Sequence, residues 1–426
     1  MKQFYSNMLK ATFVAAGFVL TSAQYSNGYI IPNEGNYGSP TAEISYIDAN
    51  NTITNNIYGL ANNGEALGDV LQSVYFSGNK SFLVVNNSNK VVVANRSSFV
   101  KSGVITNNIV QPRYTTVAND KLYTTNWGGA NDQFVSVHNA TTLAYITSIP
   151  LSQDPEEIIT VNGKVYVNKS SYRAGNSIDV INPATDTIVK TITLSNGLQS
   201  LVVSGNDIFA LCTGSTGSTV YKISTATDTV TASISNAAVV PASSYDALKF
   251  ATDGNQLFIA GSTSVYSLNT DLSAFSSTPA FTTTSSSPYG DFYGFAAIDG
   301  KIFQCNSDFT SNSTVKVYNQ TGTLLNTFTA GLGSNNVYKN VYAAGILAVA
   351  EKSNVKTVSI YPNPVSDILY IRNAEAAQYS ISDLSGRILK SGLYQNGIVV
   401  SDLQKGTYLI HISGKNNQVT EKFIIQ

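Results

Sequence analysis

The sequence predicts an all-β protein in which a seven-bladed β-propeller is followed by a small immunoglobulin-like β-sandwich. Three observations lead to this fold class: a strand motif repeats along most of the chain, charged residues make up only 12% of it, and its character changes near Val358. Asn, Ser, Thr, Gly and Tyr carry the polarity instead, as suits many short strands joined by turns. We assign the propeller to residues 24–350 and the sandwich to residues 351–426.

The repeated motif is a tight turn followed by a hydrophobic strand with an aromatic or aliphatic cluster. Its copies begin at Gly28, Lys80, Lys121, Lys164, Asp207, Gln256 and Lys301. Most are separated by about 40 to 50 residues, which leaves room for the four short strands of a propeller blade. Seven copies favour a closed ring over an extended array of sandwiches, because a ring leaves no long unpaired strand edge.

Ring closure requires a strand from the far end of the repeat region. The first copy has no inner strand before Tyr29, because the chain there has a different character. Residues 337–344 follow the last copy and have the apolar and aromatic character of an inner strand. We therefore expect this segment to complete the first blade and to join the two ends of the propeller.

The N-terminal residues have the pattern of a secretory signal peptide. Lys2 and Lys10 accompany a polar start, and residues 11–20 form an apolar run too short to span a bilayer. Small residues at Thr21 and Ala23 are those that signal peptidase requires. We predict a signal peptide in residues 1–23, cleavage after Ala23, and no transmembrane segment in the mature protein.

Composition argues against several functional classes. The net charge is −1 and no basic block occurs, so nothing predicts a nucleic-acid partner. Cys212 and Cys305 are too few for a disulfide framework, and their strand-like surroundings predict buried, unpaired thiols. Neither a zinc-ligand spacing nor a phosphate-binding glycine loop is present, so we expect no cofactor and no metal centre.

The C-terminal residues contain a series of motifs in a fixed order. The motif residues are Tyr361, Pro362, Asn363, Pro364, Asp383, Gly386, Arg387, Gly406, Tyr408, Lys422 and Phe423. Over about 70 residues this region resembles the type A C-terminal sorting domain of type IX secretion cargo, a small β-sandwich. The resemblance implies that the type IX translocon and its sorting peptidase are partners. It also implies export through the periplasm to the cell surface or the medium. An accessory immunoglobulin-like binding module is the alternative.

Loop lengths predict which face of the propeller carries the function. In an antiparallel blade, the loops between strands one and two leave at one end, and those between strands two and three leave at the other. The one–two turns are minimal, as at Asn162-Gly163, whereas the loops at the other end are long and decorated. We call the end with the minimal turns the plain face and the end with the long loops the long-loop face. Function concentrates on loops held by a rigid scaffold, so we expect the ligand on the long-loop face. The candidate ligand-binding residues are Asn33, Glu34, Tyr37, Asp69, Arg113, Tyr114, Trp127, Glu156, Tyr172, Arg173, Asp246 and Tyr293.

Each candidate also has a structural interpretation. Arg113 either binds an anionic group such as phosphate bidentately, or it neutralises Glu156 or Asp69. Trp127 either contacts a ligand or packs between blades. The same choice between ligand contact and local packing applies to Tyr37, Tyr172, Tyr293 and Glu34.

The same loops carry a second resemblance. Asn33-Glu34-Gly35, Leu67-Gly68-Asp69, Pro112-Arg113-Tyr114, Thr125-Asn126-Trp127 and Pro155-Glu156 resemble the surface-layer, YVTN-type propellers of bacterial cell surfaces, including the DUF5074-like group. Some members of that family capture corrinoids such as cobalamin, so the resemblance implies a corrinoid as a candidate ligand. Those relatives are usually lipoproteins, whereas this chain has a sorting tail instead.

We therefore predict a secreted or cell-surface, non-catalytic propeller that binds a small ligand, with a corrinoid as the named candidate. A protein-interaction or surface-layer scaffold is the first alternative. The second is a calcium-dependent hydrolase with Asp69, Glu156 and Asp246 as oxygen ligands in the central channel. His138 is the only histidine of the propeller region, so a Ser-His-Asp set on the long-loop face is not expected.

Overall fold

The computed structural model describes residues 25–129, 132–170, 173–241, 247–284, 291–342, 359–372, 378–383, 387–413 and 418–426. The chain divides into two compact units, Met1–Ile346 and Leu347–Gln426. The predicted signal peptide lies outside the described residues. Within the described residues, no helix combines the length and the apolar character needed to cross a membrane.

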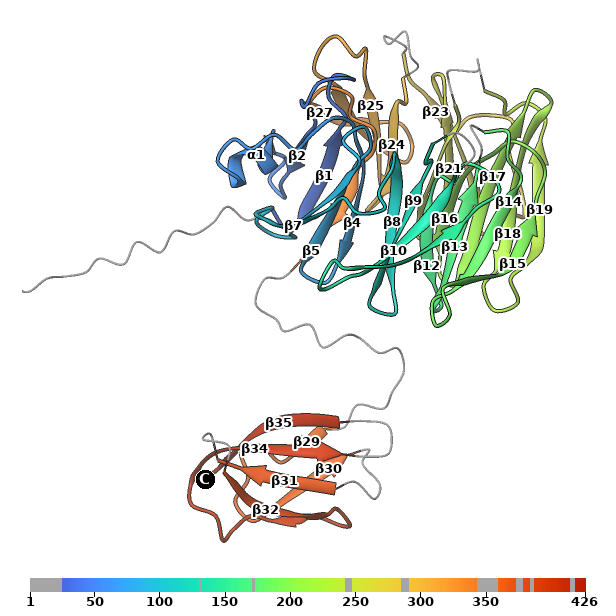
Figure 1. Cartoon of the computed structure of the whole chain (residues 1–426). Helices are drawn as coiled ribbons and strands as arrows, with labels where there is room; N and C mark the ends of the chain where they lie inside the picture. Colours follow the sequence, from blue (N-terminus) through green and yellow to red (C-terminus); the bar gives the residue numbers. More distant parts are fainter. Residues whose placement is uncertain are drawn as a thin grey trace, which may run out of the picture. The chain divides into compact units, whose positions relative to one another are not determined.

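The first unit is a ring of four-stranded antiparallel sheets, and its described part contains seven of them (Figure 1). The sheet that closes the ring has the order β28 (Tyr338–Asn340), β1 (Gly28–Asn33), β2 (Glu43–Ile47) and β3 (Ile53–Thr54), and the short helix α1 (Ile57–Ala61) follows β3. The next three sheets consist of β4 (Leu71–Ser77), β5 (Lys80–Val85), β6 (Lys90–Asn95) and β7 (Lys101–Ile105); β8 (Pro112–Ala118), β9 (Lys121–Asn126), β10 (Phe134–Asn139) and β11 (Tyr145–Pro150); and β12 (Ile158–Val161), β13 (Lys164–Lys169), β14 (Ser177–Asn182) and β15 (Thr187–Thr193). The last three consist of β16 (Leu198–Ser204), β17 (Asp207–Gly214), β18 (Gly217–Ser224) and β19 (Thr229–Asn236); β20 (Lys249–Asp253), β21 (Gln256–Gly261), β22 (Ser264–Asn269) and β23 (Phe281–Thr282); and β24 (Gly294–Ile298), β25 (Lys301–Asn306), β26 (Thr314–Asn319) and β27 (Leu324–Thr329). The predicted all-β class and propeller fold are confirmed.

The second strand of each sheet is hydrophobic along most of its length because it is buried on both faces. In β5, all residues after Lys80 are buried, because both faces of the strand pack against neighbouring sheets. In the outer strand β15, most side chains are exposed. The apolar clusters lie between adjacent sheets, for example where Tyr166 and Ile178 pack with Leu201 and Ile208. The hydrophobic motif therefore recurs in the sequence because each sheet packs against its neighbours in the same way.

The two ends of the propeller meet in one sheet, as the sequence predicted. Strand β28 pairs with β1, and Tyr338 lies opposite Ile30. The Asn340 side chain donates to the Tyr25 carbonyl at 2.7 Å and the Arg96 carbonyl at 3.0 Å, and it accepts from Arg96 Nε at 2.8 Å. The ring is thus closed by backbone pairing and by one buried amide.

Tight turns define the plain face of the propeller. The turn between β12 and β13 has two residues, Asn162 and Gly163, with φ angles of 49° and 74°. Positive φ at both positions is what a type I′ hairpin turn requires, and Asn and Gly tolerate it best. The connections into the inner strands and the loops after the second strands leave at the opposite end, where the candidate site lies.

The second unit is a two-sheet β-sandwich. One sheet has the order β29 (Ser359–Tyr361), β30 (Ile368–Arg372) and β33 (Ile398–Val399); the other has the order β32 (Ile388–Leu393), β31 (Gln378–Ser382), β34 (Gly406–Ser413) and β35 (Gln418–Ile425). Their facing residues form one apolar core that includes Leu369, Ile410 and Phe423.

Several sorting-motif residues hold this sandwich together. Asn363 donates to the Lys422 carbonyl at 2.9 Å and accepts from the Ile424 amide at 3.0 Å, which fastens the Tyr-Pro-Asn-Pro segment to the last strand. The Tyr408 hydroxyl donates to the Gln404 carbonyl. Arg387 binds the carboxylate of Asp383, four residues earlier in the chain. Gly406 opens β34, and Gly386 lies outside the described residues.

Both cysteines are buried and free, as predicted. Burial raises the pKa of the Cys212 thiol to about 11 and that of the Cys305 thiol to about 12. Because the thiolate is the reactive form, neither cysteine is suited to redox chemistry or nucleophilic attack.

Candidate functional site

The mouth of the central channel on the long-loop face is hollowed into two adjoining cavities. One has a volume of about 320 Å³ and the other about 380 Å³. Residues that line both are Arg113, Tyr114, Arg173, Lys249, Asn335 and Asn336. We call the cavity with Trp127, Glu156, Glu157 and Ser200 the Trp127 lobe, and the one with Glu34, Tyr37, Tyr293 and Phe309 the Tyr293 lobe. The shared residues make them two halves of one site.

The central channel continues beneath this mouth. A cavity of about 490 Å³ is lined by all the inner strands, from Val74 in β4 to Tyr338 in β28. It shares Tyr114, Glu157 and Phe250 with the Trp127 lobe. Site residues therefore stand where each inner strand begins, and the rigid ring sets the distances between them.

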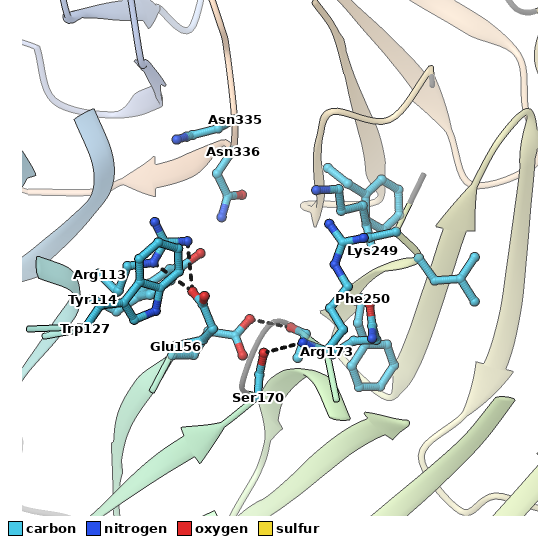
Figure 2. A pocket seen from close by; sticks show the side chains of 16 residues that line it. Arg113, Tyr114, Trp127, Glu156, Ser170, Arg173, Lys249, Phe250, Asn335 and Asn336 are labelled. Atoms are coloured by element: carbon cyan, nitrogen blue, oxygen red, sulfur yellow. Dashed lines mark hydrogen bonds and ion pairs between the residues drawn. The ribbon is translucent and has the colours of Figure 1, made fainter. Parts of the chain in front are cut away.

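Arg113 lies at the centre of a packed group in the Trp127 lobe (Figure 2). Its guanidinium lies 3.8 Å from the centre of the Trp127 ring and forms an ion pair with Glu156 at 3.0 Å. It also donates to the Gln72 side chain. The Trp127 indole nitrogen donates to the Pro155 carbonyl at 3.0 Å. Arg113 and Trp127 thus hold each other in one orientation.

Glu157 is a partly buried carboxyl that lines the same lobe. It accepts from Ser200 Oγ at 2.6 Å, from Asn168 Nδ2 at 2.7 Å and from the Leu201 amide at 3.1 Å. Burial nevertheless raises the pKa of Glu157 to about 7, because the low dielectric around it disfavours the charged form. Burial also raises the pKa of the neighbouring Glu156, against the attraction of Arg113.

The Tyr293 lobe is lined by aromatic rings and by a second partly buried carboxyl. Glu34 accepts from Asn335 Nδ2 at 2.9 Å, and burial raises its pKa. Tyr293 packs edge to face on Phe309 with ring centres 4.8 Å apart. At the rim, Tyr37 leaves 82% of its surface exposed. An exposed aromatic ring beside a cavity offers a flat surface to a ligand.

Two further cations lie across the site from the Arg113 group. Figure 2 shows Arg173 and Lys249 on the side opposite Arg113 and Trp127, with Asn335 and Asn336 between the two sides. Lys249 lies over the Tyr293 ring, with its Nζ 5.5 Å from the ring centre. The backbone of Arg173 has φ 70°, a left-handed conformation that costs an ordinary residue roughly 1 kcal/mol.

The structure brings together most of the residues singled out in the sequence. Arg113, Tyr114, Trp127, Glu156 and Arg173 line the Trp127 lobe, and Glu34, Tyr37 and Tyr293 line the other. Asn33 lies elsewhere: it is fully buried and bonds Ser45 and Ser334 near the ring closure. Asp69 accepts from the Gly38 amide and from Asn87, and so it shapes the loop that carries Tyr37. Tyr172 and Asp246 lie outside the described residues.

Sequence reasoning missed Lys249, Glu157, Asn335 and Asn336. Each stands at the start of an inner strand or of the closing strand, in the position that Arg113 and Tyr114 occupy in β8. Comparing the same position in every repeat would have found them.

Of the three carboxylates proposed as calcium ligands, the two in the described residues have protein partners. Glu156 pairs with Arg113, and Asp69 Oδ2 accepts hydrogen bonds from the Gly38 amide and from the Asn87 side chain, which belong to two other loops. Among the described residues, no three His, Cys, Asp or Glu side chains gather as a metal-binding group.

Each of the two units matches a known family model. A family model described as "Domain of unknown function (DUF5074)" matches residues 27–296, and one described as "Secretion system C-terminal sorting domain" matches residues 359–426. No curated protein matches the chain.

Several solved structures match the chain at low identity. A functionally unknown protein from Desulfotomaculum acetoxidans is 12% identical with a TM-score of 0.54, and the match covers 74% of this chain and 99% of that one. Hydrazine synthase of Kuenenia stuttgartiensis is 17% identical with a TM-score of 0.49, covering 62% and 87%. The Dos1 propeller is 12% identical with a TM-score of 0.47, covering 70% and 77%. At 12% identity, the match to the Desulfotomaculum acetoxidans protein concerns the fold alone. The chain therefore belongs to the DUF5074 family, and it carries a type IX sorting domain that directs it to the cell surface or the medium.

Proposed function

We propose that this exported propeller is a non-catalytic binding protein that captures a small molecule with an anionic group at the two-lobed mouth of its channel. The observation that carries the proposal is the convergence of Arg113, Arg173 and Lys249 on one cavity that also presents aromatic rings. Cations attract phosphate or carboxylate groups, and the rings suit a flat ligand.

Arg173 and Lys249 line both lobes from the side opposite Arg113, and we propose that they contact the ligand directly. Arg113 already has Glu156, Gln72 and Trp127 as neighbours, so its main contribution is to hold the wall of the site. Arg173 is exposed at the rim, and its left-handed backbone conformation is kept despite its cost.

A corrinoid is the first ligand to test. It combines a flat macrocycle with a phosphodiester, and the site combines aromatic surfaces with cations. It is larger than either lobe, so it would lie across both of them and against the long loops that bear Tyr37 and Trp127.

Titration of the full chain with cobalamin, followed by absorbance and by calorimetric heat, tests the proposal. We expect one-to-one binding that weakens about tenfold or more in Arg173→Ala and in Lys249→Ala, since a lost charge-assisted hydrogen bond costs about 1.5 to 3 kcal/mol. Lys339→Ala on the plain face is the matched control and should bind as the wild type does. Absence of binding would remove the corrinoid, and failure with haem and glycans as well would favour a protein-interaction scaffold.

A further inference from the structure

The sorting sandwich has exposed apolar side chains on both outer faces, but on one face they are contiguous and include stacked aromatic rings. On the three-stranded sheet, Leu369, Ile371 and Ile398 point into the core, so the alternate residues of the same strands point outward. These outward residues are Tyr361, Ile368, Tyr370, Arg372 and Val399, and we call them the aromatic stripe. On the four-stranded sheet, the outward positions of the inner strands are polar, for example Ser380 and His411. The exposed apolar residues Ile388, Leu393 and Ile424 lie apart from one another on its two edge strands.

The stripe is contiguous and ordered by side-chain contacts. Tyr361 lies opposite Tyr370 in the register, and their rings stack with centres 5.5 Å apart. The Arg372 guanidinium lies 5.0 Å from the centre of the Tyr361 ring. Ile368 lies opposite Val399 on the next strand. Four apolar or aromatic side chains and one cation therefore form a single row across the sheet.

The fold accounts for other motif residues but not for this row. Asn363 binds the last strand, and Phe423 fills the core. Tyr361, in contrast, has 44% of its surface exposed, and Val399 has 54%. Large apolar groups kept together on the outside of a small domain mark an interaction surface. The family assignment supplies the kind of partner, because a sorting domain acts by being bound by the secretion machinery.

We propose that the aromatic stripe is the surface of the sorting domain that docks on the receiving protein of the type IX secretion system. The partner surface that fits it is apolar and carries a hydrogen-bond acceptor or a carboxylate for Arg372. Burial of the stacked tyrosines would make them the main binding residues of the interface, as aromatic residues commonly are. The proposal is independent of the ligand site in the propeller.

Export of the full chain from a bacterium with a type IX system tests the proposal. Val399→Glu places a charge in the stripe, and Leu393→Glu does the same at an equally exposed position outside it, with 54% and 55% of the side chains exposed. We expect the exported fraction of Val399→Glu to fall about tenfold or more, since a misplaced charge at an interface core costs over 1.4 kcal/mol. The retained protein should accumulate inside the outer membrane, while Leu393→Glu is exported normally.

Two tyrosine variants separate docking from folding. Tyr361→Phe keeps the ring and should be exported, whereas Tyr361→Ser removes an outward ring and should be retained. Thermal unfolding of each retained protein must match the wild type. Normal export of Val399→Glu and Tyr361→Ser would overturn the proposal, as would retention of Leu393→Glu to the same extent as Val399→Glu.

Discussion

Arg113 and Glu156 show how one ion pair supports the site. Their side chains are only 15% and 16% exposed, so each depends on the other for its charge balance. Glu156→Ala would leave the guanidinium without a counter-charge in a largely dry setting, and we expect the free energy of unfolding to fall by about 2 to 3 kcal/mol. Urea unfolding measures this. Lys101→Ala breaks the exposed pair with Glu65 and should cost less than about 1 kcal/mol. Equal losses in the two variants would argue against the role given to the Arg113 pair.

Glu157 gives a pH dependence with a definite sign. Its pKa is about 7 in the folded protein and near 4.5 in the unfolded chain, so the folded state binds the proton more tightly. The stability that this group contributes is therefore fully present below about pH 4.5 and is lost as the pH rises through 7. Glu157→Gln removes the titration. Urea unfolding at pH 5 and pH 8 gives the free energy of unfolding of each protein. We expect the value for the variant minus that for the wild type to be about 2 kcal/mol larger at pH 8 than at pH 5. A difference that does not vary with pH would show that Glu157 does not titrate in this range.

At the scale of elements, neighbouring sheets are linked by a repeated contact between a second strand and the following sheet. Lys121 and Tyr123 in β9 bind Asp186 in the turn before β15, at 2.7 and 2.5 Å. Lys164 and Tyr166 in β13 bind Asp228 in the same way, at 2.6 Å each. The two aspartates have φ 54°. The turn thus presents its carboxylate to the sheet before it.

We expect removal of these tyrosine hydroxyls to loosen the ring. Tyr123→Phe and Tyr166→Phe should each lower the free energy of unfolding by about 1 to 2 kcal/mol, and the double variant by about the sum. Tyr145→Phe loses only an exposed bond to Ser148 and serves as the control in the same thermal unfolding series. If all three single variants behaved alike, the contact would contribute nothing specific to the junction between sheets.

At the scale of the whole molecule, stability depends on closing the ring. The fully buried Asn340 side chain joins β28 to the Tyr25 and Arg96 carbonyls. Asn340→Ala should therefore cost about 2 to 4 kcal/mol, because two carbonyls lose their donor. Lys339→Ala, one residue earlier, removes only an exposed pair with Asp299 and should be nearly neutral. Calorimetry of both variants measures the difference, and an equally mild Asn340→Ala would mean that backbone pairing alone closes the ring.

The repeat explains why the fold was predictable and the site only partly so. Periodic strands and tight turns reveal the packing between sheets directly, and the apolar segment after the last repeat revealed the closure. Site residues such as Lys249 and Asn336 follow no local motif, because they meet only when the inner strands form a ring. Asn33 was misleading for the opposite reason: it is polar and next to a loop, yet its amide is used inside the closure. Residue type alone does not distinguish these two uses of asparagine.

The central claim is that the long-loop face is the binding face. Amide hydrogen exchange of the exported protein with and without cobalamin tests it most directly, because it reports which backbone segments a ligand protects. We predict slower exchange in the loops that carry Tyr37, Trp127, Glu156 and Asn335, and unchanged exchange in the plain-face turns at Asp120, Gly163 and Asn206. Protection of the plain-face turns, or no protection anywhere, would contradict the claim.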